Sequence, residues 1–127
     1  MAVAVTNTTT ILNTAVAITA NAATSTTINE AEVFTITPNK ADYKTSVIIK
    51  NVAVNQGSIT YSCAAADSMH AGKAQTGTVV QGTEAVVQFE GAFVMQDAGT
   101  YLLTLTPATG KKLLTDHAAV VTVIGNL

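Results

Sequence analysis

The feature that most constrains the fold of this chain is a series of short apolar runs, each bounded by residues that favour turns. Residues 58–62 and 104–106 alternate polar with apolar side chains, which is typical of a β-strand with one buried and one solvated face. We predict strands over residues 14–19, 33–37, 45–50, 58–64, 77–80, 85–89, 101–106 and 120–124. Turns recur at intervals of roughly 8 to 12 residues in sandwich folds, so we expect a single antiparallel β-sandwich, immunoglobulin-like or jelly-roll-like.

Signals for helices are weak outside one segment. Residues 111–119 can form a turn or two of helix, and in that arrangement we expect Asp116 and His117 to face solvent. The fold class that we predict is therefore all-β, with at most one short helix.

Composition supports this fold class. Hydrophobic residues make up 48% of the 127 residues, whereas only 11% are charged. An average soluble domain carries about 25% charged residues, so uncharged polar side chains must cover much of this surface. Thr and Val, which are abundant here, favour pleated structure because branching at Cβ restricts their side chains.

The charge pattern and the single Cys exclude several classes. The net charge is −2, and the basic residues are six Lys with no Arg, so we expect no nucleic-acid partner. One Cys cannot form an internal disulfide or a four-Cys zinc site. No basic residue precedes Lys40 and no apolar run reaches about 18 residues, so we expect neither secretion nor a membrane span, and folding in the cytoplasm.

The first thirty residues differ from the rest, because they consist of Thr, Ala and Asn with almost no charge. We divide the chain into residues 1–30, an N-terminal arm or edge strands, and residues 31–127, the β-sandwich domain. An arm would become ordered by adding a strand to the exposed sheet edge of a neighbouring subunit, which would make a homo-oligomer. The residues expected to make such contacts are Thr8, Thr10, Leu12, Val16 and Ile18.

The stretch CAAADSMHAGKAQTG, residues 63–77, concentrates the reactive side chains. A nucleophilic site would use Cys63 with His70 as its base and Asp67 to orient the base. However, Cys63 is in phase with Ile59 and Tyr61 on an alternating strand, which predicts a buried and inert thiol. We interpret the stretch as a loop after a core strand and expect no enzymatic activity.

Metal, cofactor and phosphate sites are not expected either. His70, Asp67 and His117 lack the HxH or HxxxH spacing of metal ligands, and no phosphate-binding loop is present. Glu30 and Glu32 alternate on one strand, where we interpret them as a solvated edge. We therefore expect no cofactor.

The most informative short motif is Asp97-Ala98-Gly99-Thr100-Tyr101. It resembles the tyrosine corner of immunoglobulin-type domains, in which Tyr packs across the end of the sandwich and its hydroxyl bonds to upstream backbone. The resemblance implies a structural corner made by Asp97, Gly99 and Tyr101. The chain departs from antibody domains, since Leu103 stands at the position of their second Cys and the chain contains no Trp.

A broader resemblance covers residues 34–124. The chain order is Phe-Thr-Ile-Thr-Pro, Val-Ile-Ile-Lys-Asn, the Ala71-Gly72-Lys73 loop, Val-Val-Gln-Gly-Thr, Val-Gln-Phe-Glu-Gly-Ala-Phe and the Gly-Thr-Tyr strand. This order resembles the small β-sandwich proteins that decorate the heads of tailed bacteriophages. The resemblance implies a structural virion protein on the capsid surface, made in the host cytoplasm, with the major capsid protein or like subunits as partners.

The contacts expected on this reading are the N-terminal segment and the loop that contains Asp67, His70 and Lys73. Two alternatives remain open: an adhesive or scaffold immunoglobulin-like domain of a surface protein, and a phage tail structural protein. Some adhesive domains close a Lys–Asn isopeptide bond, for which Lys50 and Asn126 are the candidates by position.

Overall fold

A computed structural model describes residues 2–67 and 72–126. Its strands are β1 (Ala2–Ala4), β2 (Thr8–Thr9), β3 (Asn21–Ala22), β4 (Glu32–Ile36), β5 (Thr45–Asn51), β6 (Ile59–Cys63), β7 (Gln75–Val79), β8 (Thr83–Val87), β9 (Tyr101–Thr106) and β10 (Val120–Gly125). The helical segments are the 3-10 turn η1 (Asp42–Lys44), the short helix α1 (Gly91–Val94) and the π-helical turn η2 (Leu113–His117).

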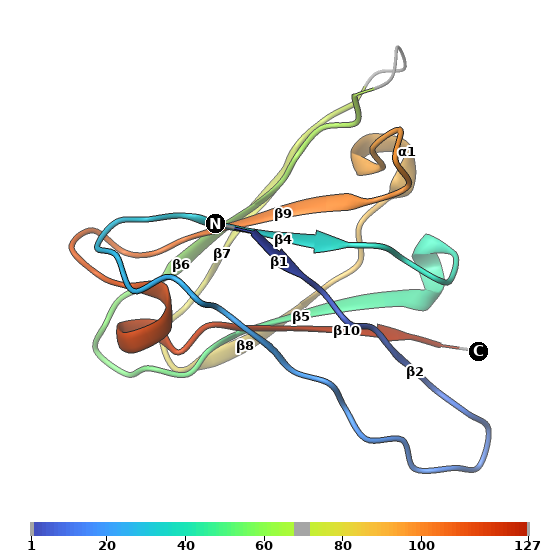
Figure 1. The fold of residues 1–127 in the computed structure, drawn as a ribbon, viewed down its shortest axis with the longest axis horizontal. Helices are drawn as coiled ribbons and strands as arrows, with labels where there is room; N and C mark the ends of the chain where they lie inside the picture. The colour runs from blue at the N-terminus through green and yellow to red at the C-terminus, as the bar shows by residue number, and fades with distance from the viewer. Residues whose placement is uncertain (1, 68–71, 127) are drawn as a thin grey trace.

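The strands form two sheets of five strands. Sheet A has the order β1-β4-β9-β6-β7, and sheet B has the order β2-β10-β5-β8, with β3 also paired to β10. In Figure 1 the strands of sheet A lie in the upper part of the molecule and those of sheet B in the lower part. The fold is therefore mostly β, as predicted.

One core takes side chains from the buried faces of both sheets. In β5 the burial alternates along the whole strand, so that Val47 and Ile49 are fully buried while Ser46, Ile48 and Lys50 are partly exposed. The core residues of the other strands include Phe34, Ile36, Ile59, Leu103, Leu105, Val121 and Val123. Full burial of one such side chain contributes roughly 1.5–3 kcal/mol, so this shared core is the main source of stability.

The paired strands run antiparallel except at two places, and these correct the expectation of a purely antiparallel architecture. Strand β1 runs parallel to β4, with Ala2 opposite Val33, and β2 runs parallel to β10, with Thr8 opposite Ile124. Both exceptions involve the first ten residues. A tight hairpin can join only antiparallel strands, whereas parallel strands need a long connection. The N-terminal strands can pair in parallel because many residues separate β1 from β4 and β2 from β10.

The predicted strands agree with the structure from residue 32 onward, to within two residues at each end. The predicted strand over residues 14–19 is wrong: this segment has no regular strand, and β3 begins only at Asn21. The expectation of at most one short helix is also wrong, since both α1 and η2 form. Helix α1 lies where the sequence shows only an apolar run, Gly91–Val94, beside Phe89.

The short strands of residues 1–30 occupy edge positions: β1 lies at one edge of sheet A, and β2 and β3 lie along the outer side of β10. Polar side chains hold this segment. The Asn21 amide donates to the carbonyl oxygens of Thr6 at 3.2 Å and Val121 at 3.0 Å, and its Oδ1 accepts from the Thr6 N–H at 2.9 Å. The domain division at residue 30 stays a prediction.

Two titratable side chains that we expected at the surface, Glu32 and His117, are fully buried. Glu32 is 0% exposed, and its carboxylate accepts hydrogen bonds from the Thr24 N–H at 2.7 Å and the Thr24 hydroxyl at 2.5 Å. The expectation that Glu32 lies on a solvated edge is therefore wrong. A buried carboxylate is tolerated here because it meets hydrogen-bond donors from the segment before β4.

His117 is also 0% exposed, whereas we expected it to face solvent. Its Nε2 accepts from the Ala108 N–H at 3.1 Å, and its Nδ1 lies 3.1 Å from the Asn51 Oδ1. Since the N–H of Ala108 needs an unprotonated Nε2, the neutral tautomer carries its proton on Nδ1 and donates it to Asn51. Burial lowers the pKa of His117; Asp116 opposes this shift, and Lys111 adds to it.

We predict that the protein loses stability as the pH falls below the ordinary pKa of His. The unfolded chain then binds a proton that the folded His117 excludes, so the free energy of unfolding drops by up to about 1.4 kcal/mol per pH unit until the folded pKa is reached. Urea unfolding between about pH 7 and about pH 5 measures this slope.

The variant His117→Asn tests the assignment, because it removes the titrating group. We expect it to be less stable at neutral pH and to have a flatter pH dependence over the same range. His70→Gln is the matched control for removing a histidine. If His70→Gln flattens the slope and His117→Asn does not, the assignment to His117 is wrong.

Candidate interaction surface

The stretch that contains most reactive side chains does not assemble a nucleophilic site in the described residues. Cys63 ends β6 on its buried face, at 0% exposure, as predicted, and burial raises the pKa of its thiol to about 12. A thiol with such a pKa is almost entirely protonated at neutral pH and is a poor nucleophile. His70, the expected base, lies outside the described residues.

The ends of this stretch are tied to the segment around α1. The N–H groups of Ala66 and Lys73 both donate to the Phe93 carbonyl oxygen, at 2.8 and 3.1 Å. The Asp67 carboxylate accepts from the Asp97 N–H at 2.7 Å. The side chains of Asp67 and Lys73 are exposed. These contacts fix the position of the chain where it leaves β6 and enters β7.

The motif that resembles a tyrosine corner lies beside this connection. Gly99 adopts a φ of 79° and donates to the Gln96 carbonyl oxygen at 2.8 Å, which closes a tight turn before β9. The Tyr101 side chain is buried, and its ring makes an edge contact with Phe89, with centroids 6.0 Å apart. Burial, and then the nearby carboxylate of Asp42, raise the pKa of Tyr101. The corner assignment of Asp97, Gly99 and Tyr101 stays a prediction.

A metal site is not formed by the acidic, His and Cys side chains of residues 2–67 and 72–126, which include no group of three placed to hold an ion. Asn51, the partner of His117, also donates to the Gly57 carbonyl oxygen at 3.0 Å, just before β6 begins. Asp67 instead follows the other end of β6. Two of the side chains that we considered as ligands, Asp67 and His117, therefore lie near opposite ends of β6, and His70 is outside the described residues.

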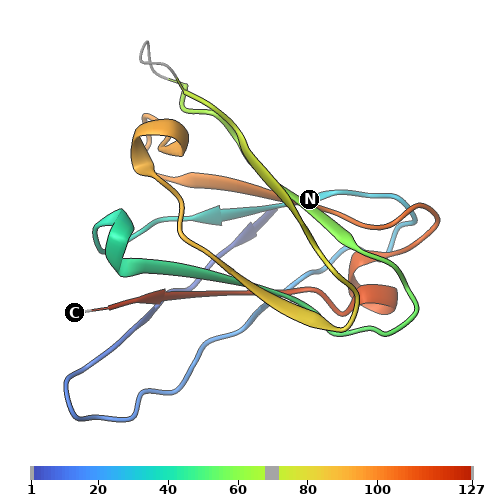
Figure 2. The same cartoon turned by 180° about the vertical axis from the view of Figure 1, so that it is seen from behind.

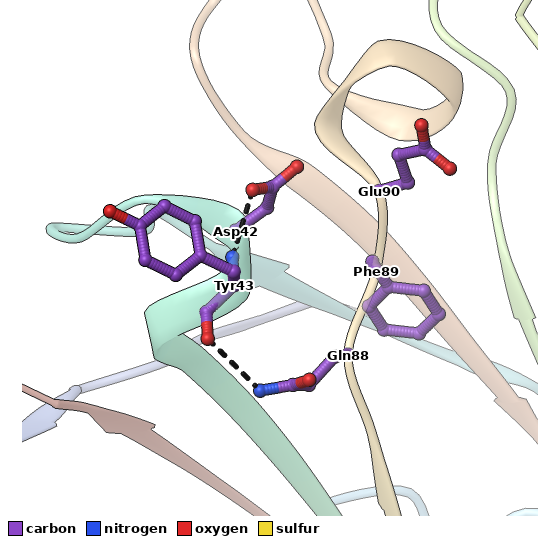
Figure 3. A pocket seen from close by; sticks show the side chains of 5 residues that line it. All are labelled: Asp42, Tyr43, Gln88, Phe89 and Glu90. Atoms are coloured by element: carbon purple, nitrogen blue, oxygen red, sulfur yellow. Dashed lines mark hydrogen bonds between the residues drawn. The ribbon is translucent and has the colours of Figure 1, made fainter.

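A shallow hollow between η1 and the segment after β8 is lined by Asp42, Tyr43, Gln88, Phe89 and Glu90, and hydrogen bonds engage Asp42 and Gln88 (Figure 3). The Asp42 carboxylate accepts from the N–H of Tyr43 at 2.8 Å and from the N–H of Gly91 at 3.1 Å. The Gln88 amide donates to the Tyr43 carbonyl oxygen at 3.3 Å. These bonds join η1 to the segment between β8 and α1, so we assign them a structural role.

The most unusual surface lies on the outer side of sheet B. We define the outer face by the side chains that alternate away from the core: Ile48 and Lys50 on β5, Glu84 and Val86 on β8, and Val120 and Thr122 on β10. Val86 is 65% exposed, and Val52, just after β5, is 47% exposed. A sheet face that meets only water is normally polar, so apolar side chains here suggest a covered surface.

A loop forms one wall of this face. Residues 10–20, here named the N-terminal loop, connect β2 with β3 and extend away from both sheets (Figures 1 and 2). Ile18 and Ala20 of the loop border a groove of about 290 Å³ whose floor includes Ile48 and Thr122. The face and the loop therefore form one continuous, weakly charged surface.

The N-terminal loop exposes apolar side chains along its length. Leu12 is 75% exposed, Ile18 63%, Ile11 57% and Val16 36%. Within the loop, Ile11 and Thr14 form an isolated bridge around Asn13, which adopts a φ of 55°. The Thr8 hydroxyl accepts from the Thr19 N–H at 2.9 Å and closes its base.

The structure separates the residues that we predicted as partner contacts into three groups, apart from His70, which lies outside the described residues. Thr8 is buried in β2, and Thr10 donates its N–H to the Gly125 carbonyl oxygen at 2.9 Å, so both help to attach the loop. Leu12, Val16 and Ile18 are exposed on the loop. Asp67 and Lys73 belong to the β6–β7 connection, which lies on the opposite side of the molecule (Figures 1 and 2).

The outer face was not predicted from the sequence. Its signal was present in the runs Val47-Ile48-Ile49 and Ala85-Val86-Val87, because alternate residues of a strand cannot all enter one core. A strand with three successive apolar residues therefore exposes one of them on its other face. Those residues are Ile48 and Val86.

The candidate isopeptide pair is contradicted. Lys50 lies opposite Val120 at the start of β10, whereas Asn126 follows Gly125, which lies opposite Thr45. Six residues of strand separate Lys50 from the position of Asn126, or about 20 Å at 3.4 Å per residue. No such bond can join Lys50 to Asn126 in this fold.

Comparisons with protein-family models, with curated proteins and with solved structures found no match to this chain. In the described part of the chain, no helix has the length and apolar character needed to span a membrane.

We predict that Cys63 resists modification in the folded protein. A thiol reagent at neutral pH should react with the native protein at least roughly 10²-fold more slowly than with the chain unfolded in urea, because the folded thiol is buried and protonated. The double variant Ser62→Cys, Cys63→Ser moves the thiol by one residue, to the side of β6 that is not buried. Rapid reaction of native wild-type protein would contradict the assigned burial, whereas the moved thiol should react readily.

Proposed function

We propose that this chain is a structural virion protein that binds the outside of a bacteriophage capsid, with its two sheets arranged as an immunoglobulin-like β-sandwich. The resemblance of residues 34–124 to phage head decoration proteins suggests the partner. The observation that carries a binding role is the exposed N-terminal loop, on which Leu12, Val16 and Ile18 meet solvent.

The chemistry of the loop supports protein contact. Residues 2–29 contain no charged side chain, so a partner that covers them needs to remove water only from neutral groups. Removing water from an unpaired charge costs far more than from a hydroxyl or amide that finds a new hydrogen bond. The loop thus offers apolar area with a low cost of burial.

The position of the loop decides which of the expected contacts we retain. It projects from the side of the molecule opposite to the β6–β7 connection (Figures 1 and 2). A capsid surface that receives the N-terminal loop therefore leaves Asp67 and Lys73 facing away from it. We propose the loop as the capsid contact.

Binding to a shell also explains how a small contact is sufficient. Each copy would bury a modest area, but a lattice presents many equivalent sites, and contacts between neighbouring copies add to each binding event. The mechanism is additive binding free energy, without a chemical step.

A sedimentation experiment tests the proposal. We would purify the major capsid protein from the genome that encodes this chain, assemble expanded heads without decoration, and mix them with the purified protein. We expect the wild-type protein to sediment with the heads. Replacing Leu12 or Ile18 by Ser removes an exposed apolar contact of about 1.5 kcal/mol and should weaken binding about tenfold per site.

Val54→Ser is the matched control, since Val54 is 67% exposed but lies outside the loop and the outer face. It should bind like the wild type. Wild-type protein that stays in the supernatant at all concentrations would count against a capsid partner. Equal binding by the Leu12 and Val54 variants would count against the loop as the contact.

A further inference from the structure

The outer face of sheet B contains two cross-strand pairs along the β5–β8 ladder. Ile48 lies opposite Val86, and one pleat further Lys50 lies opposite Glu84. The ammonium of Lys50 and the carboxylate of Glu84 are 3.9 Å apart, and their side chains are 45% and 58% exposed. In each pair, one residue therefore belongs to β5 and the other to β8, on either side of a line that runs between the two strands.

The outer face carries one positive and one negative side chain, next to each other. Among the residues that form the strands of sheet B, Lys50 and Glu84 are the charged ones. Their neighbours Ile48, Val86 and Val120 are apolar, and the groove beside them is bordered by Ile18. A partner that covers the face must match one positive and one negative charge side by side.

We propose that a second copy of this chain docks on the outer face of sheet B, related by a two-fold axis that runs parallel to the strands between β5 and β8. Such an axis lies midway between two facing sheets, so that β5 of one copy faces β8 of the other. It places Lys50 of one copy against Glu84 of the other, and Val86 against Ile48, twice in each dimer.

The outer faces of two copies are therefore complementary to each other in both charge and shape. Each ammonium then lies between two carboxylates, and the exposed Val86 covers the half-buried Ile48 at the edge of the groove. Two facing sheets pack about 10 Å apart, a distance that these side chains span. Because the face presents few side chains, we expect a contact smaller than the standard interface of about 800 Å² per partner and a dissociation constant on the order of 10 μM.

Charge reversal tests this arrangement. Lys50→Glu gives a face with two carboxylates, and Glu84→Lys gives a face with two ammonium groups. Neither variant should dimerise, because like charges would meet across the axis, and we expect each dissociation constant to rise by roughly 10²-fold. Sedimentation velocity over a series of concentrations measures the association.

The decisive samples are the mixture and the double variant. An equimolar mixture of Lys50→Glu and Glu84→Lys should form a heterodimer, because each carboxylate face meets an ammonium face. The double variant Lys50→Glu, Glu84→Lys should again dimerise like the wild type. An effect of the single variants on folding alone cannot produce recovery on mixing.

Controls separate this face from the rest of the surface. Lys44→Glu and Glu90→Lys make the same changes in net charge outside the strands of sheet B and should leave the dimer unchanged. Val86→Thr keeps a β-branched side chain but removes an apolar contact and should weaken the dimer, whereas Val80→Thr, at a residue that is 57% exposed, should not.

A wild-type protein that stays monomeric to roughly 1 mM overturns the proposal, since that concentration far exceeds the expected dissociation constant. A dimer that persists in Lys50→Glu, or a mixture that shows no preference for the heterodimer, also overturns it and indicates another surface, such as pairing along the free edge of β8. The proposal does not depend on the capsid partner, because these variants leave the N-terminal loop unchanged.

Discussion

The antiparallel pairing of β5 with β10 is the interaction on which the rest of the structure depends. Six consecutive residue pairs join the two strands, from Thr45 opposite Gly125 to Lys50 opposite Val120. The pleat of this pair sends Val47 and Val123 into the core and Ile48 to the outer face. The core, the outer face and the attachment of the N-terminal strands all follow from this one register. A slip by a single residue would exchange the two faces.

The free side of β10 explains why the first thirty residues can be attached with so little apolar burial. Strands β2 and β3 occupy only the two ends of that side, where they pair with Ile124 and Val121. Hydrogen bonds from Asn21 and to Glu32 complete the attachment, and both side chains are buried. Buried polar groups must keep specific partners, so they fix one position for the segment where apolar packing alone would permit several. The loop between β2 and β3 can then project from a fixed base.

Much of the fold could be predicted from residue 32 onward, because alternation is a local property of the chain. The strand at Tyr101–Thr106 shows this best, since its buried residues Tyr101, Leu103 and Leu105 alternate without interruption. The N-terminal strands could not be predicted in the same way. Their pairing with β4 and β10 joins residues about a hundred positions apart or runs parallel, and neither property leaves a local pattern. The strand expected over residues 14–19 failed because its apolar residues have no neighbouring strand to pair with.

The burial of His117 and Glu32 could not be predicted either, because their partners come from distant segments. Sequence alone shows two titratable residues in polar surroundings, and their solvation is then the reasonable expectation. Only the fold brings Asn51 and the N–H of Ala108 to His117, and Thr24 to Glu32. The candidate contacts were predicted only in part for a related reason. Exposure of Leu12 and Ile18 follows from a neutral segment without a sheet partner, but the pairing of Ile48 with Val86 and of Lys50 with Glu84 on the outer face depends on the register between β5 and β8.

The two exposed apolar surfaces have different physical character, and this difference argues for different partners. The outer face is part of a rigid sheet, and its two charges are held 3.9 Å apart in a fixed order. A partner for it must have a matching order of charge, which a second copy supplies through symmetry. The N-terminal loop has no charge and no regular strand, so it can adapt to a surface of different shape. The two proposals thus assign self-association to the sheet and attachment to a larger assembly to the loop, and Ile18, which borders the groove beside the outer face, is the residue at which the two surfaces meet.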